Sequence, residues 1–360
     1  MEGTPIVVVV VGETVRNRQS GQAHAGIGGV VGAVVNRCRD MVPVLVLVGG
    51  AGYFAAFSLF RNHAASLLVF VPVALVVAWA RRWREGVCVW VPLAIYLDAF
   101  ARLRSLADET AVPIRHTALA QADRALFRGT VPTVWLQTRW HTIGQFGPLD
   151  YAAVALHWSH FVLPIVTLVG LWLTRHALFR RYYLAFLVLT TLVLIGYFVF
   201  PATPPWLAAR EGTLLSPLPL ARPMVEIAAA INRNLFGTIY TTIGGTNDVA
   251  AMPSLHAAYP CLMATVCWQT ARRLGVIGLV YYLLMSFALI YLAEHYVVDV
   301  LASAVCVLVA VRIAAAIDAR LPAALPLLPA PVAVARKHMP RHVPDAPSAS
   351  PASTKGMATR

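Results

Sequence analysis

Charged residues are scarce in this chain, since only 12% of its 360 residues are Asp, Glu, Lys or Arg. A soluble domain usually contains about 25% charged and about 45–50% apolar residues. Here 59% of the residues are apolar and the mean hydropathy is +0.68. The shortage of charge excludes an ordinary soluble globular protein. The sequence therefore predicts an integral membrane protein with several transmembrane helices, in contact with the lipid bilayer.

The formal net charge of +13 raises a competing interpretation, a protein that binds nucleic acid. Many of the basic residues, however, lie in short segments between long apolar stretches. The cytoplasmic loops of membrane proteins carry their positive charge in this way. We therefore expect no nucleic-acid partner.

The chain also lacks the short motifs of several common enzyme classes. It contains no Gly-x4-Gly-Lys-Ser/Thr nucleotide loop, no His-Glu-x-x-His zinc pair and no Gly-x-Ser-x-Gly nucleophile turn. Its five cysteines form no Cys-x-x-Cys pair, and most lie in apolar runs, which is typical of small buried side chains. We expect neither a metal site nor a cofactor.

Eight apolar stretches approach the roughly 20 residues that a helix needs to cross a bilayer. They cover about residues 41–60, 65–80, 86–101, 150–173, 182–200, 253–271, 274–293 and 295–317. The predicted fold class is all-α, a polytopic helical bundle in a membrane catalytic domain over 41–318. We expect a disordered cytoplasmic segment at 1–40 and a disordered cytoplasmic tail at 319–360, which is rich in Pro, Ala and Ser.

Arginine-rich loops set the expected orientation of the bundle. Basic residues follow the second and eighth stretches, and they separate the fourth from the fifth and the sixth from the seventh. All these loops fall on one side if both termini are cytoplasmic. Segments 102–149 and 201–252 then lie outside, although the six arginines of 102–149 oppose this orientation. The amphipathic sequence LAIYLDAFARLRSLAD (93–108) suits a helix at the outer interface.

Two polar stretches interrupt the apolar sequence, and this orientation brings both to one face. AAMPSLHAAYP (250–260) lies at the outer start of the sixth stretch, and EHYVVDV (294–300) lies at the outer start of the eighth. Pro253 favours a helix beginning there, so Ser254 and His256 fall in its first turn. The free backbone N–H groups and the dipole of a helix N-terminus favour an anion, and phosphate is the expected occupant.

His295 and Asp299 are four residues apart, so they share one face of a helix. A carboxylate there can accept the proton of one imidazole nitrogen and leave the other nitrogen free to attack. Each motif alone has a structural alternative, either an interfacial histidine or a structural His–Asp hydrogen bond. Because ionisable residues at membrane depth are costly, two such motifs on one face favour a catalytic site.

PSLH (253–256) followed by HYVVDV (295–300) resembles the second and third signature motifs of the type 2 phosphatidic acid phosphatase superfamily. With FPATPPW (200–206) and ADRALFRGTVPTVWLQ (122–137), the chain is most similar to the branch containing the inositol phosphorylceramide synthases, over roughly residues 90–315. The resemblance implies a core of six membrane helices, here about 86–318, with about two further helices at the N-terminus.

The resemblance also implies roles for individual residues. His295 would be the nucleophile that forms a phosphohistidine, and Asp299 would orient it and stabilise its positive charge. His256 would be the general acid and then the general base. Ser254 would hold phosphate oxygens together with nearby N–H groups. Arg210 is the best candidate for the phosphate clamp of the first motif, because guanidinium matches the geometry of phosphate.

Departures from the phosphatase pattern agree better with the transferase branch. Leu255 stands where phosphatases have Gly, the Ser-Arg pair ahead of the third-motif histidine is absent, and Arg222-Pro223 lacks the expected Lys upstream. These losses leave phosphate charge less neutralised. His160, within the fourth stretch, is a candidate to line the site. Candidates to supply the missing positive charge are Arg102, Arg104 and Arg233.

The predicted function is an integral-membrane lipid phosphotransferase that moves a phospho-headgroup, such as inositol phosphate, between lipids through a phosphohistidine. One alternative is a lipid or polyprenyl phosphate phosphatase with water as acceptor. Another is an inactive or transport-related membrane protein. The expected substrates are lipids with phosphate headgroups. The expected location is the plasma membrane of a bacterium, with the site on the extracytoplasmic face.

Overall fold

The computed structural model describes residues 41–53, 73–79, 82–107, 109–214, 220–231 and 247–321. Within these ranges the regular elements are all helices, which confirms the predicted all-α class. The segment predicted to be disordered at 1–40 and most of the predicted tail at 319–360 lie outside the described residues, as does Arg233.

Six helical units correspond to the six predicted stretches between 86 and 317. They are α3 (Trp83–Arg104), the pair α6 (Pro148–Ser159) and α7 (Leu163–Thr174), α8 (His176–Val199), α11 (Leu255–Thr270), α12 (Arg272–Tyr291) and α13 (Val297–Arg320). Among the described helices, α3, α8, α12 and α13 are each long and apolar enough to cross a membrane, and the α6–α7 pair adds a fifth candidate. These lengths and compositions fit an integral membrane protein.

The structure refines one prediction about these helices and corrects another. The fourth apolar stretch passes as a candidate span only as a bent pair, because α6 and α7 meet at a 47° bend. Pro164 lies in the first turn of α7, where a proline starts a helix but cannot continue one from the preceding turn. The amphipathic sequence from Leu93 onward is not a separate interfacial helix. It forms the last turns of α3, where Arg102 pairs with Asp98 at 2.7 Å.

The described parts of the first two apolar stretches are the helix Met41–Tyr53 and a short helix at residues 73–79. The first contacts α3 through a hydrogen bond from the Tyr53 hydroxyl to Asp98, at 2.8 Å. The second packs on α3 through Val77, whose methyl groups lie where a side chain on Gly86 would stand. Both therefore lie outside the six-helix core, against α3.

Large aromatic side chains and small residues hold the core helices together. Trp90 of α3 packs edge-on against Trp172 of α7, with 6.1 Å between ring centroids, and lies beside Phe179 of α8. Helices α11 and α12 approach closely at Gly278, where a Cβ would lie 2.9 Å from the Cα of Ala264. Small residues at such crossings let membrane helices pack backbone against backbone.

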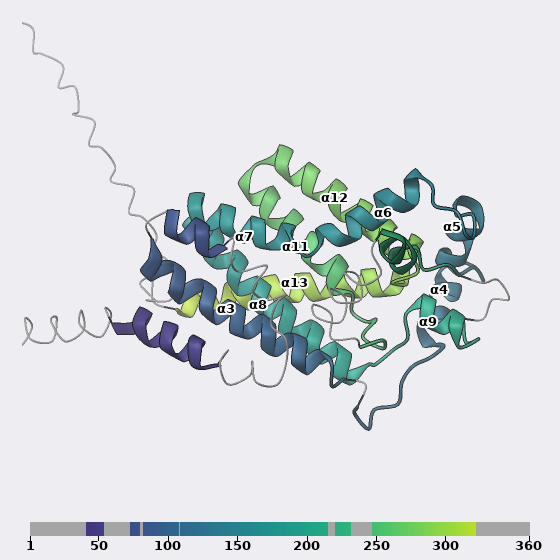
Figure 1. Cartoon of the computed structure of the whole chain (residues 1–360), viewed down its shortest axis with the longest axis horizontal. Helices are drawn as coiled ribbons and strands as arrows, with labels where there is room; N and C mark the ends of the chain where they lie inside the picture. The colour runs from purple at the N-terminus through teal and green to yellow at the C-terminus, as the bar shows by residue number, and fades with distance from the viewer. Residues whose placement is uncertain are drawn as a thin grey trace, which may run out of the picture.

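Helices α8 and α13 run antiparallel through the bundle (Figure 1), so the start of α8 lies beside the end of α13. Arg180, near the start of α8, pairs with Asp318, near the end of α13, at 2.5 Å. Arg82, just before α3, lies over the ring of Trp172 at 4.9 Å, near the end of α7. Arginines from two of the loops predicted to be cytoplasmic therefore share one end with the last turns of α13.

The opposite end carries the short helices α4 (Ala118–Leu126), α5 (Pro132–Trp140) and α9 (Pro205–Arg210), as Figure 1 shows. Three extended segments meet there, because Ala202 pairs with Arg115 on one side and with Ala250 on the other. The FPATPPW segment therefore lies directly beside the residues that lead into PSLH.

Candidate active site

Helix α11 begins at this end of the bundle, at the first of the two predicted motifs. Ser254 caps the helix, and its Oγ accepts a hydrogen bond from the N–H of Ala257 at 3.2 Å. Ser254 is fully buried, whereas His256 in the first turn is partly exposed. Helix α8 approaches this turn at Gly196, where a Cβ would lie 2.4 Å from Cδ of Pro253. The motif is therefore fixed by a cap and by close packing.

Helix α13 begins at the second predicted motif. His295 is 4% exposed and Asp299 is completely buried. The Nδ1 atom of His295 lies 3.4 Å from Oδ2 of Asp299, and the same oxygen accepts a hydrogen bond from the N–H of Tyr296 at 2.9 Å. A carboxylate accepts a hydrogen bond, so this contact favours the tautomer of His295 with its proton on Nδ1 and its lone pair on Nε2.

The two motifs meet directly. Nδ1 of His256 lies 3.3 Å from Nε2 of His295, so Asp299, His295 and His256 form a continuous chain of polar contacts. With the lone pair on Nε2 of His295, the proton of this contact belongs to His256. The nitrogen suited to attack phosphorus is therefore engaged by the second imidazole, and a phosphoryl group has to enter between the two rings.

Ser303 joins the helices that carry these residues. Its hydroxyl lies 2.7 Å from the carbonyl oxygen of Ser254 and 2.7 Å from that of Asp299, and it is completely buried. One hydroxyl thus contacts the main chain of both motifs.

Two further histidines surround His256. His160 lies at the bend between α6 and α7, with its ring centroid 4.4 Å from that of His256. His157, in the last turn of α6, stacks on His256 with centroids 4.7 Å apart and ring planes 29° apart. Both are at least 90% buried. His160 was predicted to line the site, and the structure brings it there.

His157 was missed by the sequence analysis. The available signal was the spacing in LHWSH, since residues three apart lie on the same helix face. His160 on one face of a helix therefore implied His157 beside it.

The candidate cations differ in how they lie relative to the histidines. Arg104, at the end of α3, interacts electrostatically with both His160 and His256. Asn247 holds the end of α3 near the PSLH segment, because its side-chain amide donates to the Arg104 carbonyl at 2.6 Å. Arg210, by contrast, is exposed at the end of α9 with its guanidinium 5.2 Å from the Trp206 ring. No contact among the described residues links Arg210 to the histidines.

Arg222 is a further basic residue near the site. Its guanidinium forms a two-pronged ion pair with Glu294, at 2.8 and 3.2 Å, and lies 3.7 Å from the centre of the Trp206 ring. Arg222 and Glu294 both interact electrostatically with His157. The Arg-Pro sequence at 222–223, which lacks the upstream lysine, therefore still places a guanidinium against Glu294, the residue before His295. Arg102 pairs with Asp98 instead.

In the part of the chain that the structure describes, no group of three or more His, Cys, Asp or Glu side chains is arranged to hold a metal ion. The four histidine rings stack and tilt against one another at centroid distances of 4.4 to 5.5 Å. The arrangement suits attack on phosphorus by Nε2 of His295, and it suits proton transfer by the neighbouring His256.

Comparison with known proteins agrees with this geometry. A protein of Bacteroides thetaiotaomicron named phosphoinositol dihydroceramide synthase is 30% identical over 236 residues, which cover 61% of this chain and 73% of that protein. No solved structure matches the chain. The sequence profile of the PAP2 superfamily matches residues 117–313, more than half of the chain and both histidine motifs. The chain therefore belongs to the PAP2 superfamily and is an enzyme of the phosphotransferase or phosphatase type.

Proposed function

We propose that this enzyme transfers a phosphoinositol headgroup from a glycerophospholipid to the primary hydroxyl of a ceramide-type lipid. The observation that carries the proposal is the chain of contacts from Asp299 through His295 to His256. The name of the Bacteroides relative, a phosphoinositol dihydroceramide synthase, supports the choice of headgroup and acceptor. Leu255, in place of the glycine of phosphatases, agrees with transfer rather than hydrolysis.

In the first half of the proposed reaction, Nε2 of His295 attacks the phosphorus of the donor. A bond forms between nitrogen and phosphorus, and the bond from phosphorus to the diacylglycerol oxygen breaks. His256 enters this step as an imidazolium, gives one proton to that departing oxygen and becomes neutral. Asp299 holds the Nδ1–H of His295 and stabilises the positive charge that develops on the ring.

In the second half, the acceptor hydroxyl takes the place of diacylglycerol. His256, now neutral, removes the proton of this hydroxyl, and the oxygen attacks phosphorus. The nitrogen–phosphorus bond breaks and its electron pair returns to Nε2 of His295. One histidine thus acts as acid and then as base, and the enzyme returns to its starting state.

Positive charge and N–H donors would hold the phosphate during both steps. Arg104 is suited to this role, because it interacts electrostatically with His160 and His256. The N-terminus of α11, capped by Ser254, contributes backbone N–H groups and the positive end of the helix dipole. We assign His160 to the lining of the site. The role predicted for Arg210 stays a prediction.

The purified full-length enzyme, in detergent with phosphatidylinositol and a fluorescent ceramide, tests this function. Mass spectrometry should detect a ceramide phosphoinositol and diacylglycerol in equal amounts. His295→Ala should reduce product to background, because the nucleophile is removed. His116→Ala is a matched control, since His116 is an exposed histidine at the same end, paired with Glu211 at 2.9 Å.

The hydrolase alternative gives a different result in the same assay. If water is the acceptor, the enzyme should release inositol phosphate from phosphatidylinositol at the same rate with or without ceramide. If a lipid phosphate is supplied as substrate instead, the hydrolase should release inorganic phosphate. Either result without a ceramide product would refute the transferase. An active His295→Ala enzyme would refute the phosphohistidine.

We also propose that the site faces the extracytoplasmic side of a bacterial plasma membrane. The arginines of the short loops gather at the opposite end of the bundle, around Arg82, Arg180 and Asp318. Excess Lys and Arg favours the cytoplasmic side for such loops. The histidines then open toward the outer leaflet.

A further inference from the structure

The turn that carries His295 is short and strained. It connects the end of α12 at Tyr291 to the start of α13 at Val297. Within it, the N–H groups of Glu294 and His295 both donate to the carbonyl of Leu289, at 3.0 and 3.2 Å. Ala293 has φ of +60°, a left-handed conformation that is unfavourable for a residue other than glycine. Such a turn keeps its shape only if its surroundings hold it.

Asp123 of α4 holds the turn on its α13 side. Its Oδ2 accepts a hydrogen bond from the N–H of Val297 at 3.1 Å, and its Oδ1 accepts one from the N–H of Val298 at 3.0 Å. These are the first two free N–H groups of α13, which that helix cannot satisfy itself. Asp123 is completely buried. A carboxylate from a distant helix thus caps the helix that follows His295.

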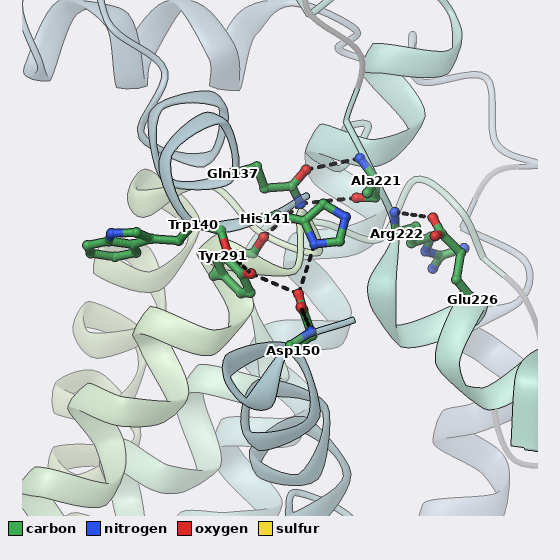
Figure 2. A network of polar contacts seen from close by, with 9 residues as sticks. Gln137, Trp140, His141, Asp150, Ala221, Arg222, Glu226 and Tyr291 are labelled. Carbon is green, nitrogen blue, oxygen red and sulfur yellow. Dashed lines mark hydrogen bonds and ion pairs between the residues drawn. The ribbon is translucent and has the colours of Figure 1, made fainter. Parts of the chain in front are cut away.

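Gln137 of α5 holds the turn on its α12 side (Figure 2). Its side-chain Nε2 donates to the carbonyl of Tyr291 at 2.8 Å and to the carbonyl of Ala221 at 3.0 Å. Its Oε1 accepts from the N–H of Ala221 at 3.0 Å. The three bonds use the whole amide, and Gln137 is 4% exposed. The last residue of α12 is therefore tied to α5.

Figure 2 also shows why the end of α12 stays in place. The Tyr291 hydroxyl donates to Oδ1 of Asp150 at 2.8 Å, and Nδ1 of His141 contacts the same oxygen at 2.9 Å. In the middle of the turn, the carbonyl of Ala293 accepts from the N–H of Trp206 at 3.0 Å. The turn is thus held at both ends and in its centre by residues outside α12 and α13.

We infer that Asp123 and Gln137, at the two ends of ADRALFRGTVPTVWLQ, are positioning residues that fix the His295 turn from its two sides. Neither residue touches the histidines, and the inference rests on the proposed role of His295 as nucleophile. The segment 122–137 has no part in the proton transfers. Its function is to hold Nε2 of His295 where it meets phosphorus.

Substitutions at Asp123 and Gln137 should therefore slow the chemical step and leave substrate binding unchanged. A displacement of about 1 Å at a reacting atom can lower the rate about 100-fold. Asp123→Asn leaves one acceptor and directs an NH₂ group at the second backbone N–H. Gln137→Glu directs a carboxylate at two carbonyl oxygens. Each change loosens one end of the turn and leaves the histidines, Asp299 and the arginines in place.

The experiment compares kcat and KM of Asp123→Asn and Gln137→Glu with two matched controls at neutral pH. Glu109→Gln removes one exposed carboxylate charge at the same end of the bundle, and Gln121→Glu changes an exposed glutamine on α4. We expect kcat of each buried variant to fall about 10- to 100-fold, with KM within about 2-fold of wild type. Both controls should keep wild-type kcat.

Each kcat is calculated per mole of monodisperse, folded protein. If Asp123→Asn or Gln137→Glu does not fold, Asp123→Ser or Gln137→Asn takes its place. Wild-type kcat in the variants at both positions would overturn the inference, as would an equal loss in the controls. A rise in KM with unchanged kcat would also overturn it. If His295→Ala were active in the same assay, the proposed nucleophile would fail first, whatever the result for the two positioning residues.

Discussion

Replacement of Gly196 by alanine separates the stability of the bundle from the geometry of the site. Gly196 lies within α8, facing the turn before α11. A Cβ there would lie 2.4 Å from Cδ of Pro253 and 3.2 Å from its Cγ. Since ordinary carbon contacts begin near 3.4 Å, α8 and the proline have to separate by about 1 Å.

The expected effect on stability is small, because two contributions oppose each other. Alanine is more favourable than glycine in a helix by about 0.8–1 kcal/mol. Overpacking at a tight contact costs about 1–3 kcal/mol. The net change is therefore about 0–2 kcal/mol of destabilisation, which lowers the thermal midpoint by a few degrees.

The expected effect on activity is much larger. Pro253 directly precedes Ser254, which caps the helix that carries His256. A shift of about 1 Å at Pro253 moves His256 relative to His295, and a misplacement of that size can lower the rate about 100-fold. The lipid-transfer assay measures kcat, and a thermal melt of the same sample measures stability.

Gly170→Ala provides the control, because Gly170 also lies within a helix, α7, but has nothing within 4 Å of the position of a Cβ. It should match or exceed wild-type stability and keep wild-type kcat. If Gly196→Ala kept full activity, or lost activity only in proportion to a loss of folded protein, contact between α8 and Pro253 would not be what fixes His256.

Two further predictions concern pH and membrane orientation. Burial raises the pKa of Asp123 to about 6, so the native state binds this proton more tightly than the unfolded chain does. As the pH rises from about 4 to about 6, the free energy of unfolding should therefore fall by up to about 3 kcal/mol. Thermal melts of Asp123→Asn should lack this slope, and equal slopes in both proteins would contradict it. A cysteine at Gln121 should react with a membrane-impermeant maleimide in intact cells, whereas one at Arg272 should react only after permeabilisation, and the reverse pattern would refute the proposed orientation.

The local parts of the site could be predicted from sequence because they depend on short spacings. His295 and Asp299 are one helical turn apart, and Pro253 indicated a helix start that lies two residues later, at Leu255, with His256 in its first turn. Both inferences need only the geometry of a single helix. The all-α class likewise followed from apolar stretches of membrane-spanning length.

The remaining parts depend on contacts between distant residues. The contact of His256 with His295 spans 39 positions, and that of Asp123 with Val297 spans 174. No single-helix pattern encodes them. The bend between α6 and α7 was missed because hydropathy is continuous across it. That bend brings His160 against His256.

The choice among arginines was limited in the same way. Arg210 follows FPATPPW directly in sequence, yet its guanidinium lies against Trp206. Arg104 is separated from the motifs by more than a hundred residues, and Asn247 brings its backbone to them. Only the contact between Asn247 and the end of α3 indicates that Arg104 lies near the histidine motifs.

The Ser303 hydroxyl has a consequence for how quickly the site can open. Because it contacts the main chain of Ser254 and Asp299 at 2.7 Å each, it opposes separation of α11 from α13. Space for a phosphoryl group then comes from rotation of the His256 ring, which is partly exposed, while Asp299 retains His295. Side-chain rotation takes picoseconds to nanoseconds, whereas displacement of packed helices takes microseconds to milliseconds. We therefore expect phosphate to enter faster than any motion that separates the two helices.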